Sequence, residues 1–97
     1  MLPDDISKFI EDNFASRERS EALALLANAR LHNGLSADVR MLRCALVASK
    51  NSLVSLKLQI DGLAHDYRDV ILAGEYVRKK GEWVQVRDLS KPFLHNA

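Results

Sequence analysis

The chain has 97 residues, of which 47% are hydrophobic, and its formal net charge is +1. This length suits one packed core, so we expect a single domain over residues 1–97. No apolar run is long enough for a membrane-spanning helix, and the balanced charge argues against generic nucleic-acid binding, which depends on many phosphate contacts. Cys44 is the single cysteine, which excludes an internal disulfide, and we expect it to be a buried small hydrophobe. Together with an acidic N-terminus unlike a secretory signal, this indicates a cytoplasmic protein.

The N-terminal third predicts two helices. The first, over residues 4–15, follows Pro3 and carries Asp4 and Asp5 at the positive end of its dipole. Four of its residues recur at helical spacing and form an apolar stripe: Ile6, Phe9, Ile10 and Phe14. The second helix is predicted over residues 17–31, with Ser16 as its N-cap and Asn33-Gly34 as its end.

Three more helices are predicted in the middle of the chain. The third, over residues 37–49, has Ser36 as its cap and is nearly all apolar, so we expect it to be the central, most buried helix. The fourth covers residues 52–64 and carries a clean apolar stripe. Asp66 then caps a short fifth helix over residues 67–73.

The C-terminal segment changes its period. Residues 75–87 alternate like two short strands, and 79–81 supply the turn between them. An isolated hairpin is marginal in water, so this one has to pack on the helices or on another chain. The predicted fold is therefore mostly α: a single compact bundle of about five helices with a short C-terminal β-hairpin. Residues 92–94 are expected to dock on the body of the domain.

No catalytic signature is present, since the chain lacks a phosphate-binding glycine loop, a nucleophile elbow and a zinc-protease motif. The three histidines, His32, His65 and His95, do not have metal-ligand spacing. We therefore predict no enzymatic activity, no metal and no cofactor.

The densest polar residues form a candidate binding cluster. Its members are Tyr67, Arg68, Asp69, Glu75, Tyr76, Arg87 and Asp88. The favoured interpretation is structural: a helix cap plus ion pairs that fasten the hairpin, with Arg68 pairing with Glu75 or Asp88, and Arg87 with Asp69. The alternative is a small-ligand site around Tyr67, Arg68, Glu75 and Tyr76.

Basic residues suggest a second alternative, nucleic-acid binding. Arg40, Arg43 and Lys50 follow helical spacing on the third predicted helix, and residues 78–80 place three bases at the hairpin tip. This pattern is compatible with a winged helix whose tip reaches a DNA backbone. The fourth predicted helix offers few groups suited to base edges, however, so the stripe is better interpreted as the solvated edge of a buried helix.

The helices carry more apolar residues than single stripes require. The surplus lies on the second and fourth predicted helices, at Leu23, Ala27, Leu31, Val54 and Leu58. Either the helices stack in layers that bury both faces, or these residues close a homodimer. The leading hypothesis is a small binding or regulatory module that acts through protein–protein contact and self-associates.

The C-terminal half also resembles a family of small bacterial proteins of unknown function. The likeness covers residues 39–93 and is most specific in its final third, in the runs Asp66-Tyr67-Arg68-Asp69-Val70-Ile71, Ala73-Gly74-Glu75-Tyr76 and Val86-Arg87-Asp88-Leu89-Ser90-Lys91-Pro92-Phe93. The runs Leu42-Arg43-Cys44-Ala45 and Ser52-Leu53-Val54-Ser55-Leu56-Lys57 also resemble the family. It implies a bacterial, cytoplasmic, helical protein and assigns no role to any residue.

Overall fold

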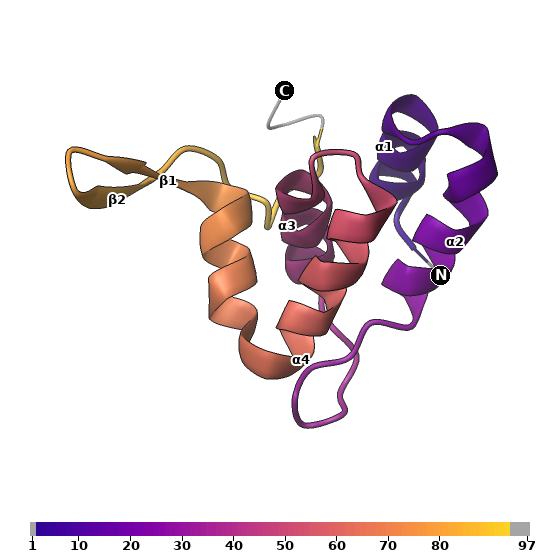
Figure 1. Cartoon of the computed structure of the whole chain (residues 1–97), viewed down its shortest axis with the longest axis horizontal. Helices are drawn as coiled ribbons and strands as arrows, with labels where there is room; N and C mark the ends of the chain where they lie inside the picture. Colours follow the sequence, from indigo (N-terminus) through magenta and orange to yellow (C-terminus); the bar gives the residue numbers. More distant parts are fainter. Residues whose placement is uncertain (1, 94–97) are drawn as a thin grey trace.

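The computed structural model describes residues 2–93, which form four helices followed by a two-stranded antiparallel hairpin. The helices are α1 (Asp4–Asn13), α2 (Ser16–Ala27), α3 (Val39–Ser49) and α4 (Leu53–Glu75), and the strands are β1 (Tyr76–Lys79) and β2 (Glu82–Gln85). Figure 1 shows the helices gathered into one body and the hairpin extending from it. The mostly helical fold with a C-terminal hairpin is confirmed, whereas the predicted number of helices is wrong.

The fourth and fifth predicted helices are one element, α4, which bends at Asp66. This residue is the only one inside α4 with non-helical dihedrals (φ −155°, ψ 99°). Its carboxylate accepts a hydrogen bond from the backbone N–H of Arg68 at 3.1 Å, which satisfies one donor at the start of the second half. The helix therefore changes direction at the expected residue, but no loop separates its two halves (Figure 1).

Helix α2 is shorter than predicted and ends at Ala27 rather than at residue 31. The chain beyond it folds back on itself, because Leu31 donates to the carbonyl of Leu35 and Ala37 to that of Ala29. These backbone bonds replace the helical ones that continuation would have required. Ser16 is the first residue of α2 and not its N-cap. The N-cap is Ala15, which makes no side-chain hydrogen bond to the helix. His32 consequently lies in the loop and not at the helix end.

Two short turns set the ends of α3. The expected cap Ser36 is wrong, since Asp38 is the N-cap and its carboxylate accepts from the backbone N–H of Met41 at 2.9 Å. At the other end Lys50 and Asn51 have φ of 52° and 65°, a left-handed turn that reverses the chain into α4. Ser52 caps α4 by accepting from Ser55.

The core lies between these elements, and α3 packs most extensively against α4. Buried hydrophobic residues come from all four helices, the loop after α2 and the C-terminal segment: Ile6, Ile10, Phe14, Ala22, Leu26, Ala29, Leu42, Cys44, Ala45, Leu46, Leu56, Leu63, Val70 and Leu89. The prediction that the third helix is the central, most buried one is confirmed.

Cys44 and Gly74 mark the closest approach of α3 to α4. A Cβ added at Gly74 would lie 2.6 Å from the Cα of Cys44, so only glycine permits this crossing. The Cys44 thiol is fully buried, as predicted, and burial followed by the charge of Glu75 raises its pKa to about 12. The thiol therefore stays protonated at neutral pH.

The C-terminal segment returns across α3 to α1. Phe93 stacks on Phe9 with ring centroids 4.5 Å apart, and its backbone N–H donates to Asp5 at 3.1 Å. The predicted docking of this segment is confirmed for Phe93, while Leu94 and His95 lie outside the described residues. Among residues 2–93, no helix combines the length and the apolar character needed to cross a membrane.

Candidate interaction arm

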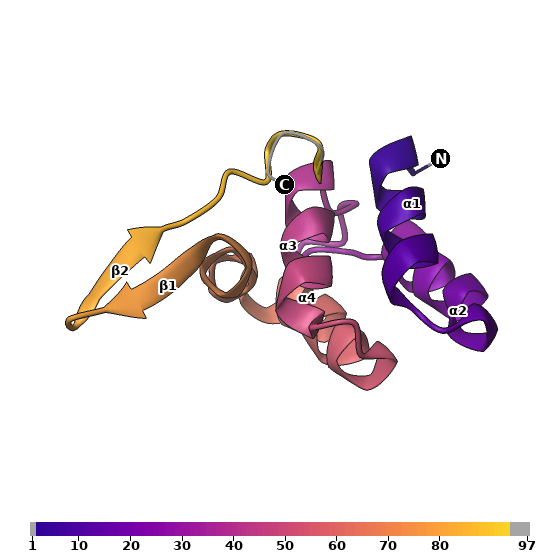
Figure 2. The ribbon, with the colours of Figure 1, turned by 90° about the horizontal axis from the view of Figure 1, so that it is seen from above.

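The hairpin forms an arm, residues 76–85, that extends from the end of α4 (Figures 1 and 2). Its strands pair in the register Tyr76 with Gln85, Val77 with Val84, Arg78 with Trp83 and Lys79 with Glu82. Lys80 and Gly81 form the turn with φ of 50° and 82°. Positive φ at both central residues gives a type I′ turn, whose twist matches that of the strands. The predicted hairpin is confirmed, although Glu75 belongs to α4 and the strands end at Gln85.

The arm leaves apolar and basic side chains in solvent. Every residue of β2 is exposed, and Trp83 keeps 50% of its surface accessible. The guanidinium of Arg78 lies over the Trp83 ring, 5.4 Å from the centroid, in cation–π geometry. Val84 points to the opposite face and is also exposed. Tyr76 and Val77 at the base of the arm are half-buried, whereas both faces of β2 are exposed, so the expected packing of the hairpin on the helices is absent along β2.

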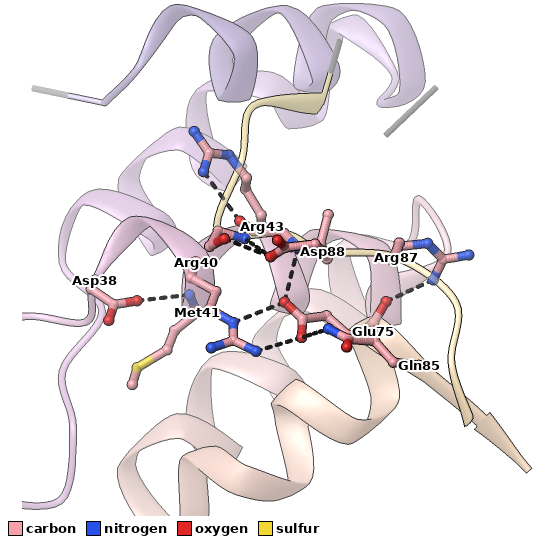
Figure 3. A network of polar contacts seen from close by, with 11 residues as sticks. Asp38, Arg40, Met41, Arg43, Glu75, Gln85, Arg87 and Asp88 are labelled. Carbon is pink, nitrogen blue, oxygen red and sulfur yellow. Dashed lines mark hydrogen bonds and ion pairs between the residues drawn. The ribbon is translucent and has the colours of Figure 1, made fainter. Parts of the chain in front are cut away.

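The base of the arm is built around Glu75, the last residue of α4, whose side chain is fully buried (Figure 3). Arg40 of α3 donates to both of its carboxylate oxygens, at 2.9 and 2.6 Å. Gln85 and the backbone N–H of Leu89 add two further bonds, at 3.3 and 2.9 Å. One carboxylate thus joins α3, α4, the arm and the C-terminal segment.

These bonds outweigh the cost of burying a charge. Burial alone would raise the pKa of Glu75, but the hydrogen bonds from Arg40 and from the Leu89 backbone lower it below its usual value. Pairing with Glu75 likewise raises the pKa of the Arg40 guanidinium, against the effect of burial. The pair is therefore ionised at neutral pH.

A second buried pair lies one turn along α3. Arg43 is only 5% exposed, donates to Asp5 of α1 at 2.8 and 3.2 Å, and also donates to the carbonyl of Leu89 at 3.1 Å. Burial would raise the pKa of Asp5, but the bonds from Arg43 and from the Phe93 backbone lower it. The two arginines of α3 together fix the C-terminal segment.

This arrangement corrects the predicted basic stripe. Arg43 is not on a solvated edge, since it is buried and paired with Asp5. Arg40 is paired with Glu75, but its side chain keeps 39% of its surface exposed, and Lys50 is exposed as expected. The spacing of the two arginines was visible in the sequence, but their distant partners, 35 and 38 residues away, were not.

The predicted polar cluster is divided between the two ends of the second half of α4. Arg68 is exposed and pairs with Asp66 at 3.0 Å rather than with Glu75. Arg87 donates to the carbonyl of Gly74 rather than to Asp69.

A hollow of about 330 Å³ adjoins Tyr67 and Arg68, but its other lining residues are His32, His65 and Asp66. Asp69 is exposed, Tyr76 is half-buried in β1, and Asp88 is half-buried in the segment after the arm. The structure therefore brings Glu75, Arg87 and Asp88 together at the base of the arm and places Tyr67, Arg68 and Asp69 elsewhere.

The predicted interface residues have different environments. Leu23 and Leu31 are partly buried against the core, and Ala27 is an exposed small side chain on α2. Val54 and Leu58 lie one turn apart on α4 and are 71% and 65% exposed. Of this set, they are the large apolar side chains that remain outside the core.

A further feature, which the sequence reasoning missed, is a hollow of about 300 Å³ beside α1. Its lining consists of Asp4, Asp5, Lys8, Phe9, Asp12, Asn13 and Phe93. The aromatic rings come from residues 84 positions apart, so only the fold brings them together. The acidic composition of residues 1–15 was the signal available in the sequence.

Comparison of the chain with protein-family models, with curated proteins and with solved structures found no match. The resemblance of residues 39–93 to a bacterial family therefore stays a prediction.

Proposed function

We propose that the chain is a binding module that acts through protein–protein contact and self-associates through its arm. The observation that carries this proposal is the exposure of Trp83 on a two-stranded hairpin whose main contact with the helices is that of β1 with α4. Such a hairpin is marginally stable alone, and cover by another chain would stabilise it. Tryptophan and arginine are also the residues that most often anchor protein interfaces.

The pair Val54 and Leu58 on α4 offers a second apolar surface for the same association. Exposed apolar patches usually mark contact sites, and two neighbouring large side chains more than half exposed are costly to leave in water. The proposal includes a cytoplasmic location, which the single unpaired cysteine favours.

Sedimentation equilibrium over a range of concentrations tests the proposal. We expect the wild-type chain to associate and Trp83→Ser to weaken that association, while Leu35→Ser, which removes an even more exposed apolar side chain from the loop after α2, leaves it unchanged. The double variant V54S/L58S measures the contribution of the α4 surface. A wild-type chain that is monomeric at every concentration contradicts self-association. Weakening by V54S/L58S with no effect of Trp83→Ser contradicts the role of the arm.

Nucleic-acid binding is the second candidate, and one observation favours it. Arg78, Lys79 and Lys80 stand together and exposed at the far end of the arm. Carboxylates engage Arg40 and Arg43, so Lys50 is the one base of the predicted stripe that stays available for such contact. Titration of duplex DNA at low salt tests it, and binding that K79E/K80E abolishes would favour this function over self-association.

A further inference from the structure

The inference developed here rests on self-association through the arm and concerns what the arm binds. One face of α1 is acidic and exposed. Asp4, Lys8, Glu11 and Asp12 recur at helical spacing, and all four are exposed, so this face has a net charge of −2. Asp5 does not contribute, because it is paired with Arg43 inside the protein. Lys8 of this face lies 3.8 Å from Asp12, and Arg19 of α2 lies beside the face, where it donates to the backbone carbonyl of Glu11 at 2.8 Å.

The hollow beside this face has an aromatic wall. Phe9 and Phe93 stack against each other there, and Asp4, Lys8 and Asp12 also line it. A volume of about 300 Å³ is at the lower end of the range for small-molecule pockets, which suits a single large side chain. Two acids against one base beside an aromatic wall favour an aromatic group accompanied by positive charge.

The arm carries that combination. Its bases Arg78, Lys79 and Lys80 stand against one acid, Glu82, which gives a net charge of +2, equal and opposite to that of the α1 face. Trp83 supplies the aromatic side chain, with the Arg78 guanidinium already over its ring. Charge and apolar character are therefore complementary between the two surfaces.

The two surfaces cannot meet within one chain. Figures 1 and 2 show the arm and α1 on opposite sides of α3 and α4, along the 39 Å axis of the molecule. Each strand of the arm has four residues and spans only about 13 Å. The complementary surface that the arm reaches has to belong to another molecule.

We propose that the arm of one copy docks on α1 of a second copy, with Trp83 entering the hollow beside Phe9 and Phe93. The basic tip then lies against Asp4, Glu11 and Asp12 of that copy. If the exchange is reciprocal, the contact forms twice in a closed dimer, as two-fold symmetry requires.

A charge-swap experiment tests this arrangement. The variant K79E/K80E changes the arm from +2 to −2, and E11K/D12K changes the α1 face from −2 to +2. Each variant alone sets like charges against each other, so we expect its association constant to fall by about tenfold or more. In an equimolar mixture opposite charges face each other in both contacts, so we expect association to be restored between the two variants. The matched control E21K/D69K adds the same charge on exposed positions of α2 and α4, away from both proposed apolar surfaces, and should leave association unchanged.

The substitutions suit the fold. Glu11 and Asp12 are exposed at the C-terminal end of α1, where lysine interacts favourably with the helix dipole. Circular dichroism of each variant confirms that the helices are retained. The sole tryptophan gives a second measurement, since its fluorescence emission should shift to shorter wavelength as the wild-type chain is concentrated and should not shift in E11K/D12K.

The outcomes separate this inference from the proposed function. Weakening by K79E/K80E but not by E11K/D12K means that the arm binds another surface, which overturns the inference and leaves self-association standing. Absence of association in the wild type overturns both. Failure of the folded variants to associate when mixed also contradicts docking on α1.

Discussion

The base and the tip of the arm lie within ten residues of each other and have opposite characters. At the base, Glu75 is fully buried and its carboxylate accepts from two side chains and one backbone N–H. At the tip, three consecutive bases and Trp83 face solvent. Burying a charge costs desolvation energy, and here it fixes the position of the strands relative to the helices. Exposed aromatic and basic side chains are the groups that most often contact a partner protein. The base therefore sets the direction of the arm, and the tip supplies the side chains that can contact a partner.

The largest effect is expected from removing the carboxylate at the base. Glu75→Ala leaves Arg40 and the N–H of Leu89 without their acceptor, and should lower the free energy of unfolding by about 2–4 kcal/mol. Urea denaturation measures it. Glu82→Ala, which removes a carboxylate from the exposed part of the arm, should change stability by about 0.5 kcal/mol or less. Equal effects of the two substitutions would contradict the distinction between base and tip.

The next effect concerns the helix crossing that holds the base. Gly74→Ala brings a Cβ against the backbone of Cys44 and should destabilise the protein by about 1–3 kcal/mol. Gly62→Ala is the matched control, since its Cβ would meet one methyl of Val70, at 3.1 Å, rather than backbone, so a shift of a few tenths of an ångström relieves the contact, and alanine favours the helix. Thermal unfolding compares them, and a Gly74→Ala chain as stable as Gly62→Ala would mean that α3 and α4 are not so closely packed.

The two buried pairs predict a pH dependence. The pKa values of Glu75 and Asp5 are lower in the folded chain than their ordinary values of 4.5 and 3.8. A lowered folded pKa gives stability that is complete above the unfolded pKa and is lost as the pH falls through the folded pKa. Stability should therefore be constant near neutral pH and fall below about pH 4.5. The double variant D5N/E75Q should be less stable at neutral pH and show a shallower loss in acid. An equally steep loss in that variant would assign the acid sensitivity to other carboxylates.

The smallest effect is expected at the turn of the arm. Lys80 has a φ of 50°, a conformation that asparagine adopts more readily, and Asn-Gly is the favoured pair in a type I′ turn. Lys80→Asn should stabilise the hairpin by a few tenths of a kcal/mol, about the scale of single turn substitutions. Nuclear magnetic resonance of the arm measures this as a rise in strand population. A fall in that population would mean that the turn differs from the one described.

The sequence predicted features that depend on local chemistry. Lys80-Gly81, the break at Asp66 and the burial of Cys44 follow from turn residues, capping and apolar runs. It failed where the backbone pairing of a loop, or a residue far along the chain, decides the conformation in place of the local signal. Asp38 caps α3 in place of Ser36, because the loop after α2 pairs with itself. Arg43 does not belong to an exposed basic stripe, because Asp5, 38 residues away, binds it. Ionic partners at such separations leave no periodic pattern, so the base of the arm could not be read from spacing alone.

Hydrogen exchange at low and high protein concentration tests the central claim most directly, because it reports on the arm residue by residue. Amides at the base, such as that of Leu89, should be protected at both concentrations. Amides of β1 and β2 should exchange fast in dilute solution and become protected as the wild-type chain is concentrated, but not in K79E/K80E. Arm amides that exchange at one rate at every concentration would contradict the account, because the arm would then have no second copy covering it.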